Sequence, residues 1–226
     1  QPADGGPVDN PLMRKFNQAD RDRDRVTVQF DLTPTERLGI NLSYFSARSD
    51  YLNSEIGLQE SEDESYTIDL NLAVGEKGAV YAFMTRDNLD SSMRNVSGAS
   101  GDPWYADTSD RITTFGFGFS NHIGEKSSIG FDYVSSDSKG EILVQTGEDD
   151  PFSPLNTDLT NMKLFFDHEF SDHWGFKFYV EREEFMSKDW ALDGYGVDGI
   201  SSVLTMGEES ADYDIWYFRV QASYRF

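Results

Sequence analysis

Strict alternation of apolar and polar residues, repeated along almost the whole chain, is the feature that most limits what this sequence can fold into. Between residues 26 and 32, Val, Phe and Leu at even positions alternate with Thr, Gln and Asp at odd positions. The same pattern returns after each set of turn residues. A period of two residues over this length predicts a β-strand with one apolar face. The repeats predict nine strands and an all-β fold.

Two kinds of connection join the predicted strands in regular succession. Short turns fall near residues 34, 76, 124 and 172. Long connections fall near residues 50–64, 87–110, 137–158 and 186–214, and their acidic residues account for nearly all of the net charge of −22. Short turns at one end and long loops at the other are typical of outer-membrane barrels. We therefore expect short periplasmic turns and long acidic extracellular loops.

The density of aromatic residues on the apolar face separates two all-β alternatives. A soluble β-sandwich also alternates, but its polar face meets bulk water and is usually rich in Lys, Glu and Thr. Here the polar face carries Gly, Ser, Asn and a few charges of both signs, and the apolar face is dense in Phe, Tyr and Trp. Aromatic side chains suit contact with lipid and with the membrane interface. The pattern favours a transmembrane antiparallel β-barrel.

Composition and missing motifs exclude several classes of function. The chain has no cysteine, so it can form no disulfide, no thiolate metal site and no covalent attachment to c-type haem. Its negative charge repels nucleic acid. No apolar run reaches the ~20 residues of a spanning helix. Carboxylates are abundant, but none stands near a histidine at a recognisable catalytic spacing, and the sequence holds no nucleophile elbow or phosphate loop. We expect no enzymatic activity.

The last residues of the chain form an alternating strand that ends in an aromatic residue. This ending resembles the signal by which the barrel assembly machinery recognises bacterial outer-membrane proteins. The signal combines a terminal aromatic, a second aromatic two residues earlier and hydrophobic residues at every other position. An edge strand of this kind offers unpaired N–H and C=O groups to a template strand. The residues expected to carry the assembly signal are Phe218, Val220, Ala222, Tyr224 and Phe226.

Four segments of the chain carry a resemblance to a known family: FNQADRDRDR at 16–25, DY at 50–51 with EIGL at 55–58, SYTIDL at 65–70, and LTMGEESADYD at 204–214. They resemble the C-terminal part of the MtrB/PioB family, the outer-membrane barrels associated with decahaem cytochromes. The likeness is specific in the loops and generic in the strands.

This resemblance implies a sheath in the bacterial outer membrane. Barrels of the family enclose a periplasmic multihaem c-type cytochrome and let its haems meet an extracellular multihaem cytochrome, so that electrons cross the membrane. The haem then belongs to the partner, and this chain is expected to bind no cofactor. Outer-membrane lipid and the assembly machinery are the other expected partners, and nucleic acid is not one. The alternative function is that of a general diffusion porin or a small membrane-anchored barrel without a redox partner.

The expected architecture departs from the family in size. Family members have more than twice as many strands as the nine predicted here. The chain is therefore expected to be the C-terminal nine to ten strands of a larger barrel, or to take a tenth strand from residues 1–21. Residues 1–21 are otherwise expected to form an extracellular loop or N-terminal segment, and residues 22–226 to supply the barrel strands.

The polar face of the strands is the candidate wall of a lumen, where charges of both signs suit a polar partner and suit water equally well. At 20–25, three aspartates alternate with three arginines, which we interpret as neighbouring ion pairs at a strand mouth in preference to a calcium site. The acidic clusters at 60–64 and 148–150 are interpreted as solvated loop surface, with weak divalent-ion binding as a hypothesis. The lumen-facing candidates are Asp69, Asn71, Asp132, Lys163, Lys177 and Arg219.

Overall fold

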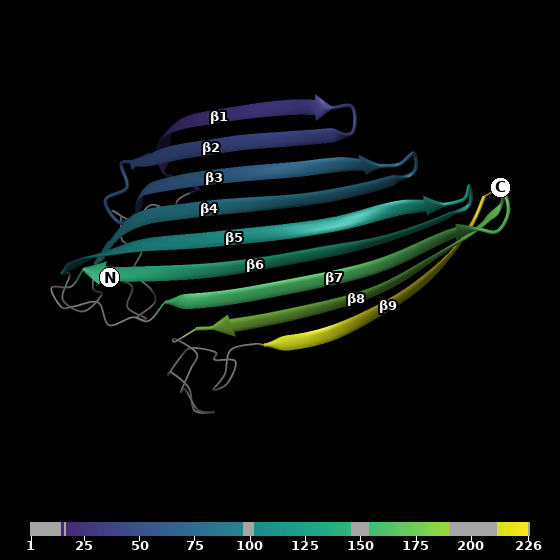
Figure 1. Ribbon diagram of the computed structural model, residues 1–226. Helices are drawn as coiled ribbons and strands as arrows, with labels where there is room; N and C mark the ends of the chain where they lie inside the picture. Colours follow the sequence, from purple (N-terminus) through teal and green to yellow (C-terminus); the bar gives the residue numbers. More distant parts are fainter. Residues whose placement is uncertain (1–14, 16, 97–101, 146–153, 190–211, 226) are drawn as a thin grey trace, which may run out of the picture.

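The computed structural model describes residues 15, 17–96, 102–145, 154–189 and 212–225. Its described residues form one antiparallel sheet of nine strands, in which each strand pairs with the next along the chain (Figure 1). The predicted all-β class and the predicted number of strands are confirmed. The strands are β1 (Asp20–Thr35), β2 (Leu38–Leu52), β3 (Gly57–Val74), β4 (Gly78–Val96), β5 (Pro103–Ile123), β6 (Ser127–Gln145), β7 (Leu155–Glu169), β8 (Trp174–Lys188) and β9 (Tyr213–Tyr224).

The four short turns lie where the sequence predicts them and gather at one end of the sheet, on the right in Figure 1. They join β1 to β2, β3 to β4, β5 to β6, and β7 to β8. Gly75 and Gly124 take left-handed φ angles of 64° and 71° in two of these turns. Glycine suits both positions because it has no β-carbon to clash in that conformation.

The predicted long connections are wrong in extent, because strand pairing continues far into three of them. Residues 57–64 belong to β3, residues 87–96 and 103–110 belong to β4 and β5, and residues 137–145 belong to β6. In these parts apolar residues are fewer and no longer follow one face in strict alternation, so the pattern that marks a strand in the sequence stops while the backbone ladder goes on. β5 has 21 residues, about twice the ~10 that cross a bilayer. The acidic cluster at 60–64 is therefore strand, and the cluster at 148–150 lies outside the described residues.

Strand register places all the apolar rows on a single face of the sheet. Residues paired across antiparallel strands share a face. From β4 to β9, one such row runs through Val80, Phe119, Phe131, Leu164, Val180 and Phe218. The alternation seen in each strand therefore adds up to a continuous apolar band across the sheet.

This apolar band does not pack against protein. Among the described residues, the only buried hydrophobic side chains are Ala47, Ile56 and Ala106. By contrast, Phe30, Phe218 and Val220 are 59%, 65% and 69% exposed. A β-sandwich would bury such a face against a second sheet. Large aromatic and aliphatic groups left open over a whole face are suited to lipid.

No helix in the described part of the chain is long and apolar enough to cross a membrane.

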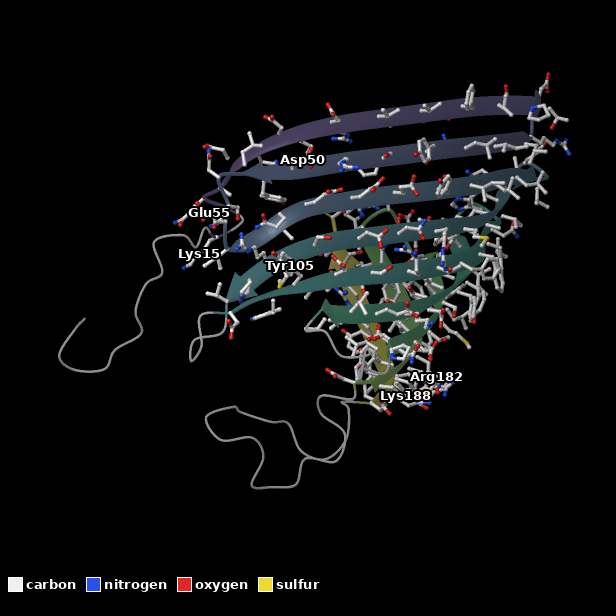
Figure 2. The ribbon with its side chains drawn as sticks, turned by 90° about the vertical axis from the view of Figure 1, so that its left-hand side faces the viewer. Lys15, Asp50, Glu55, Tyr105, Arg182 and Lys188 are labelled. Atoms are coloured by element: carbon white, nitrogen blue, oxygen red, sulfur yellow. The ribbon has the colours of Figure 1, made fainter. Side chains whose placement is uncertain are left out.

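The opposite, polar face is the inner side of a curled sheet. A single hollow of about 760 Å³ is lined both by residues of the β1–β2 turn, such as Thr35 and Arg37, and by Tyr179 of β8. These segments lie at opposite ends of the strand order, so the sheet must bend around the hollow. In Figure 2, β8 and β9 are accordingly seen behind the strands of the middle of the sheet. Among the described residues, β1 and β9 have one pairing neighbour each, which leaves one open edge on each strand.

Candidate functional site on the concave face

The six lumen-facing candidates all lie on this concave face. The register pairs Asp69 with Asn41, Asn71 with Gly39, and Asp132 with Lys163. Lys177 pairs with Gln221 and Arg219 pairs with Tyr179 on the same face. Asn71, Asp132 and Lys163 line the hollow directly. Their shared face follows from period-two alternation, because every second residue of a strand points the same way.

Asp132 is held by a hydrogen bond from a residue that the sequence pattern did not single out. The hydroxyl of Tyr81 on β4 donates to Asp132 Oδ1 at 2.8 Å, across the intervening β5. The ring of Tyr81 reaches over Gly118, where an added β-carbon would lie 2.6 Å from Tyr81 Cε1. A side chain on residue 118 would block this path.

Two more aromatic rings lie against glycines on the same face. Phe83 lies over Gly116, where an added β-carbon would fall 2.6 Å from its Cζ, and Phe165 occupies the corresponding space at Gly130. Aromatic side chains laid over strand glycines cover backbone that would otherwise be bare. Because the rings lie against the wall, they line the concave space without projecting across it.

Two cations converge on one aromatic ring at the β7–β9 side of the hollow. Lys163 Nζ lies 5.4 Å from the ring centroid of Tyr179 and 5.9 Å from that of Phe165. Arg219 Cζ lies 5.9 Å from the same Tyr179 ring. These distances are within the range of cation–π attraction. We call Lys163, Tyr179 and Arg219 the cation–tyrosine cluster.

Two other concave charges have partners nearby, and a third has none among the described residues. Lys177 Nζ lies 3.5 Å from Asp167 Oδ1, in a partly exposed ion pair. Asp31 accepts hydrogen bonds from the amides of Gln29 and Asn41, the latter at 2.6 Å. Asp69, beside Asn41 in register, makes no ion pair with any described residue.

The alternating Asp and Arg residues at the start of β1 do not pair with one another, and that interpretation is wrong. Neighbours in a strand point to opposite faces, so the aspartates lie on the convex face and the arginines on the concave face. Arg23 instead approaches Asp63 of β3, at 3.6 Å. Among the described residues, no group of three or more His, Asp or Glu side chains could hold a metal ion.

Convex carboxylates beyond the apolar band have two opposite environments. Arg182 donates to both oxygens of Asp214, at 3.0 and 2.8 Å, and this pairing lowers the pKa of Asp214. Asp158 is paired in register with Asp137, and burial together with that neighbouring carboxyl raises the pKa of Asp158. Figure 2 labels Arg182 on β8, on the side of the molecule away from β1.

Four of the five expected assembly-signal residues lie in β9 on the apolar face. Phe218 pairs with Val180, Val220 with Phe178, Ala222 with Phe176 and Tyr224 with Trp174. Phe226 lies outside the described residues.

Sequence reasoning missed the aromatic residues of the concave face. Polar-face positions are occupied by four aromatic residues, Tyr81, Phe83, Phe165 and Tyr179. Two of them, Tyr81 and Phe83, make the alternation near 79–86 less clean than elsewhere. The sequence did hold a signal for them: aromatic residues occupy some polar-face positions, and glycines occupy others.

A long curled sheet with an exposed apolar convex face and a polar concave face defines the class of transmembrane β-barrel proteins. Among solved structures, that of the copper transporter OprC is similar to this chain, with a TM-score of 0.64 and 11% sequence identity. The match covers 90% of this chain and 33% of OprC. At this identity the likeness shows the fold alone. The predicted barrel class is confirmed.

The chain belongs to the MtrB/PioB family of outer-membrane β-barrel porins, whose sequence profile matches residues 3–226. It is 28% identical over 218 residues to outer membrane protein MtrB of Shewanella baltica (strain OS185). That match covers 96% of this chain and 31% of the relative. The chain thus spans about a third of the length of each of these two proteins.

Family membership confirms the resemblance seen in the sequence, the outer-membrane location and the non-enzymatic character of the chain. The absence of cysteine leaves no haem-attachment motif in the sequence.

Proposed function

We propose that this chain forms part of the wall of an outer-membrane sheath around a multihaem c-type cytochrome, which carries electrons across the membrane. The haem belongs to the enclosed periplasmic cytochrome, which passes electrons to or from an extracellular multihaem cytochrome. The chain itself separates the cytochrome from lipid and holds it in position. The observation that carries the proposal is the combination of family membership with a concave wall that is polar, charged in both signs and hollowed.

The two faces of the sheet suit the two environments that a sheath separates. The convex apolar band suits hydrocarbon, where each unsatisfied polar group costs several kcal/mol. The concave face carries Asp31, Asp69, Lys163 and Arg219, groups that stay charged only beside water or a polar partner. A folded cytochrome surface offers such a partner, since protein interfaces have polar rims with hydrogen bonds.

Closing the wall requires partners for the open edges of β1 and β9. Unpaired N–H and C=O groups do not persist in hydrocarbon, so a spanning sheet must continue until it closes. We propose that further strands continue the sheet from both edges. Intact-mass measurement on the native protein tests this: a mass well above 25.6 kDa agrees with additional strands in the same polypeptide. A mass near that value contradicts them.

Co-purification tests the sheath proposal itself. The tagged protein, extracted from native outer membranes in mild detergent, is expected to bring down a red partner with haem absorbance in a fixed ratio to the barrel. A colourless barrel contradicts the sheath.

The second candidate function is that of a diffusion pore. The observation in its favour is that the hollow lined by Asp132, Lys163 and Asn71 holds water as readily as it holds a protein surface. A colourless preparation that conducts ions steadily in planar bilayers would favour this function.

A further inference from the structure

Lys163 and Arg219 approach the same aromatic ring, and neither makes an ion pair with a described residue. The chain has 41 acidic residues and 19 basic ones, and several other basic residues in the described part of the chain also lack an ion pair. What distinguishes Lys163 and Arg219 among the described residues is that two cations share one neighbour, the ring of Tyr179.

The two carboxylates beside Lys163 accept hydrogen bonds from other side chains, and neither forms an ion pair with it. Its register partner on β6 is Asp132, which accepts the hydroxyl of Tyr81 at 2.8 Å. Its register partner on β8 is Glu181, which accepts the side-chain amide of Asn161 at 2.7 Å. Lys163 therefore turns to aromatic rings and lines the hollow.

Arg219 is similarly free of carboxylates. Its guanidinium donates to the neutral amide of Gln221 at 3.2 Å and lies over Tyr179 from the β9 side. Two positive charges, one on β7 and one on β9, thus flank one ring of the intervening β8, although like charges repel. An anion placed between them on the hollow side would relieve this repulsion and would form charge-assisted hydrogen bonds with both.

From this geometry we infer that the cation–tyrosine cluster is a docking point for carboxylate side chains on the surface of the protein enclosed by the sheath. The inference rests on the proposed function. An acidic patch of the partner would then face β7–β9, and this contact would fix the orientation of the partner inside the sheath. Charge complementarity of this kind sets orientation and register more than it sets affinity.

The test compares two double variants of the full native protein, expressed in its own outer membrane. The first, Lys163→Glu with Arg219→Glu, reverses the charge of the cluster. The control, Arg48→Glu with Lys139→Glu, makes the same change in net charge on the convex face, where it also breaks the ion pairs of Arg48 with Glu60 and of Lys139 with Glu141. Each protein is pulled down in mild detergent, and haem absorbance per barrel is measured as the sodium chloride concentration rises.

We expect wild type and control to retain haem equally, and the cluster variant to retain roughly tenfold less at low salt, since like-charge contacts across an interface are strongly unfavourable. Lys163→Gln with Arg219→Gln, which keeps size but removes charge, should fall between them and should lose the salt dependence. If the charge-reversed protein fails to reach the membrane, this glutamine variant alone tests whether the cation–tyrosine cluster binds the partner.

The failures are distinguishable. If wild type carries haem and both cluster variants retain it with the same salt dependence as the control, the docking point is refuted and the sheath stands. If wild type itself is colourless, the sheath and the docking point fall together.

Discussion

The ring of Phe165 on β7 occupies the space that a β-carbon on Gly130 of β6 would fill. The two residues are register partners on the concave face. The same added carbon would also lie 2.8 Å from the backbone oxygen of Phe119. Gly130 is therefore fixed by contacts on two sides.

Gly130→Ala should destabilise the folded barrel by about 1–3 kcal/mol, because overpacking displaces a ring or the backbone. The measurement is the free energy of unfolding in lipid vesicles by denaturant titration. Gly39→Ala is the matched control, since its added carbon would meet nothing closer than 3.9 Å. Equal effects at the two positions would contradict the role assigned to the Phe165 ring.

Tyr81→Phe should cost about 0.5–1.5 kcal/mol of unfolding free energy, because it removes the hydrogen bond to Asp132 and keeps the ring over Gly118. Tyr133→Phe serves as the control. Tyr133 lies on the convex face, and its hydroxyl has no hydrogen-bond partner among the described residues. The same vesicle titration applies, and a loss for Tyr133→Phe as large as that for Tyr81→Phe would contradict the assignment.

The sequence predicted the sheet well where one face meets lipid and poorly where both faces meet water. Period-two alternation located all nine strands and all four short turns. In β3 it began too late, at residue 66, because Glu60, Glu62 and Glu64 occupy the convex face with charged residues, while the backbone ladder to β4 is already formed there. Hydrogen-bonded pairing does not depend on an apolar side chain, so hydropathy could not mark the true strand ends.

The candidate site shows the same division. Alternation alone placed Lys163 and Arg219 on the polar face. Their convergence on Tyr179 depends on which residue of β7 lies beside which residue of β8 and β9. That register is set by turn geometry and by the packing of whole strands. A single sequence does not state it. The mistaken pairing of the Asp and Arg residues of β1 has another cause, because it overlooked that neighbours in a strand point to opposite faces.

Asp158→Asn should stabilise the β6–β7 pairing at neutral pH. The pKa of Asp158 is raised in the folded state by burial and by Asp137. Because the folded state favours the protonated carboxyl, Asp158 contributes to stability at pH values below its ordinary pKa. This contribution is lost as pH rises through the pKa of the folded state. The variant's advantage in denaturation midpoint should therefore be present near pH 7 and should vanish below about pH 4.

Asp214→Asn provides a control of opposite sign in the same experiment. Arg182 lowers the pKa of Asp214, so its contribution is present above the ordinary pKa and is lost as pH falls through the folded value. This variant should be destabilised near pH 7 and should match wild type in strong acid. If both variants shift the midpoint in the same direction at pH 7, the two environments have been assigned wrongly.

Val220→Arg tests which face of β9 meets lipid. Val220 lies near the middle of β9 and is 69% exposed on the apolar face, beside Phe178. An arginine facing lipid near the bilayer midplane costs about 2–4 kcal/mol. The same substitution at Gln221 points to the polar face beside Lys177, where water or a polar partner solvates it. Heat-resistant folded protein in outer-membrane fractions should fall sharply for Val220→Arg and little for Gln221→Arg. Equal yields from the two variants would mean that the exposed apolar band is covered by protein and does not face lipid.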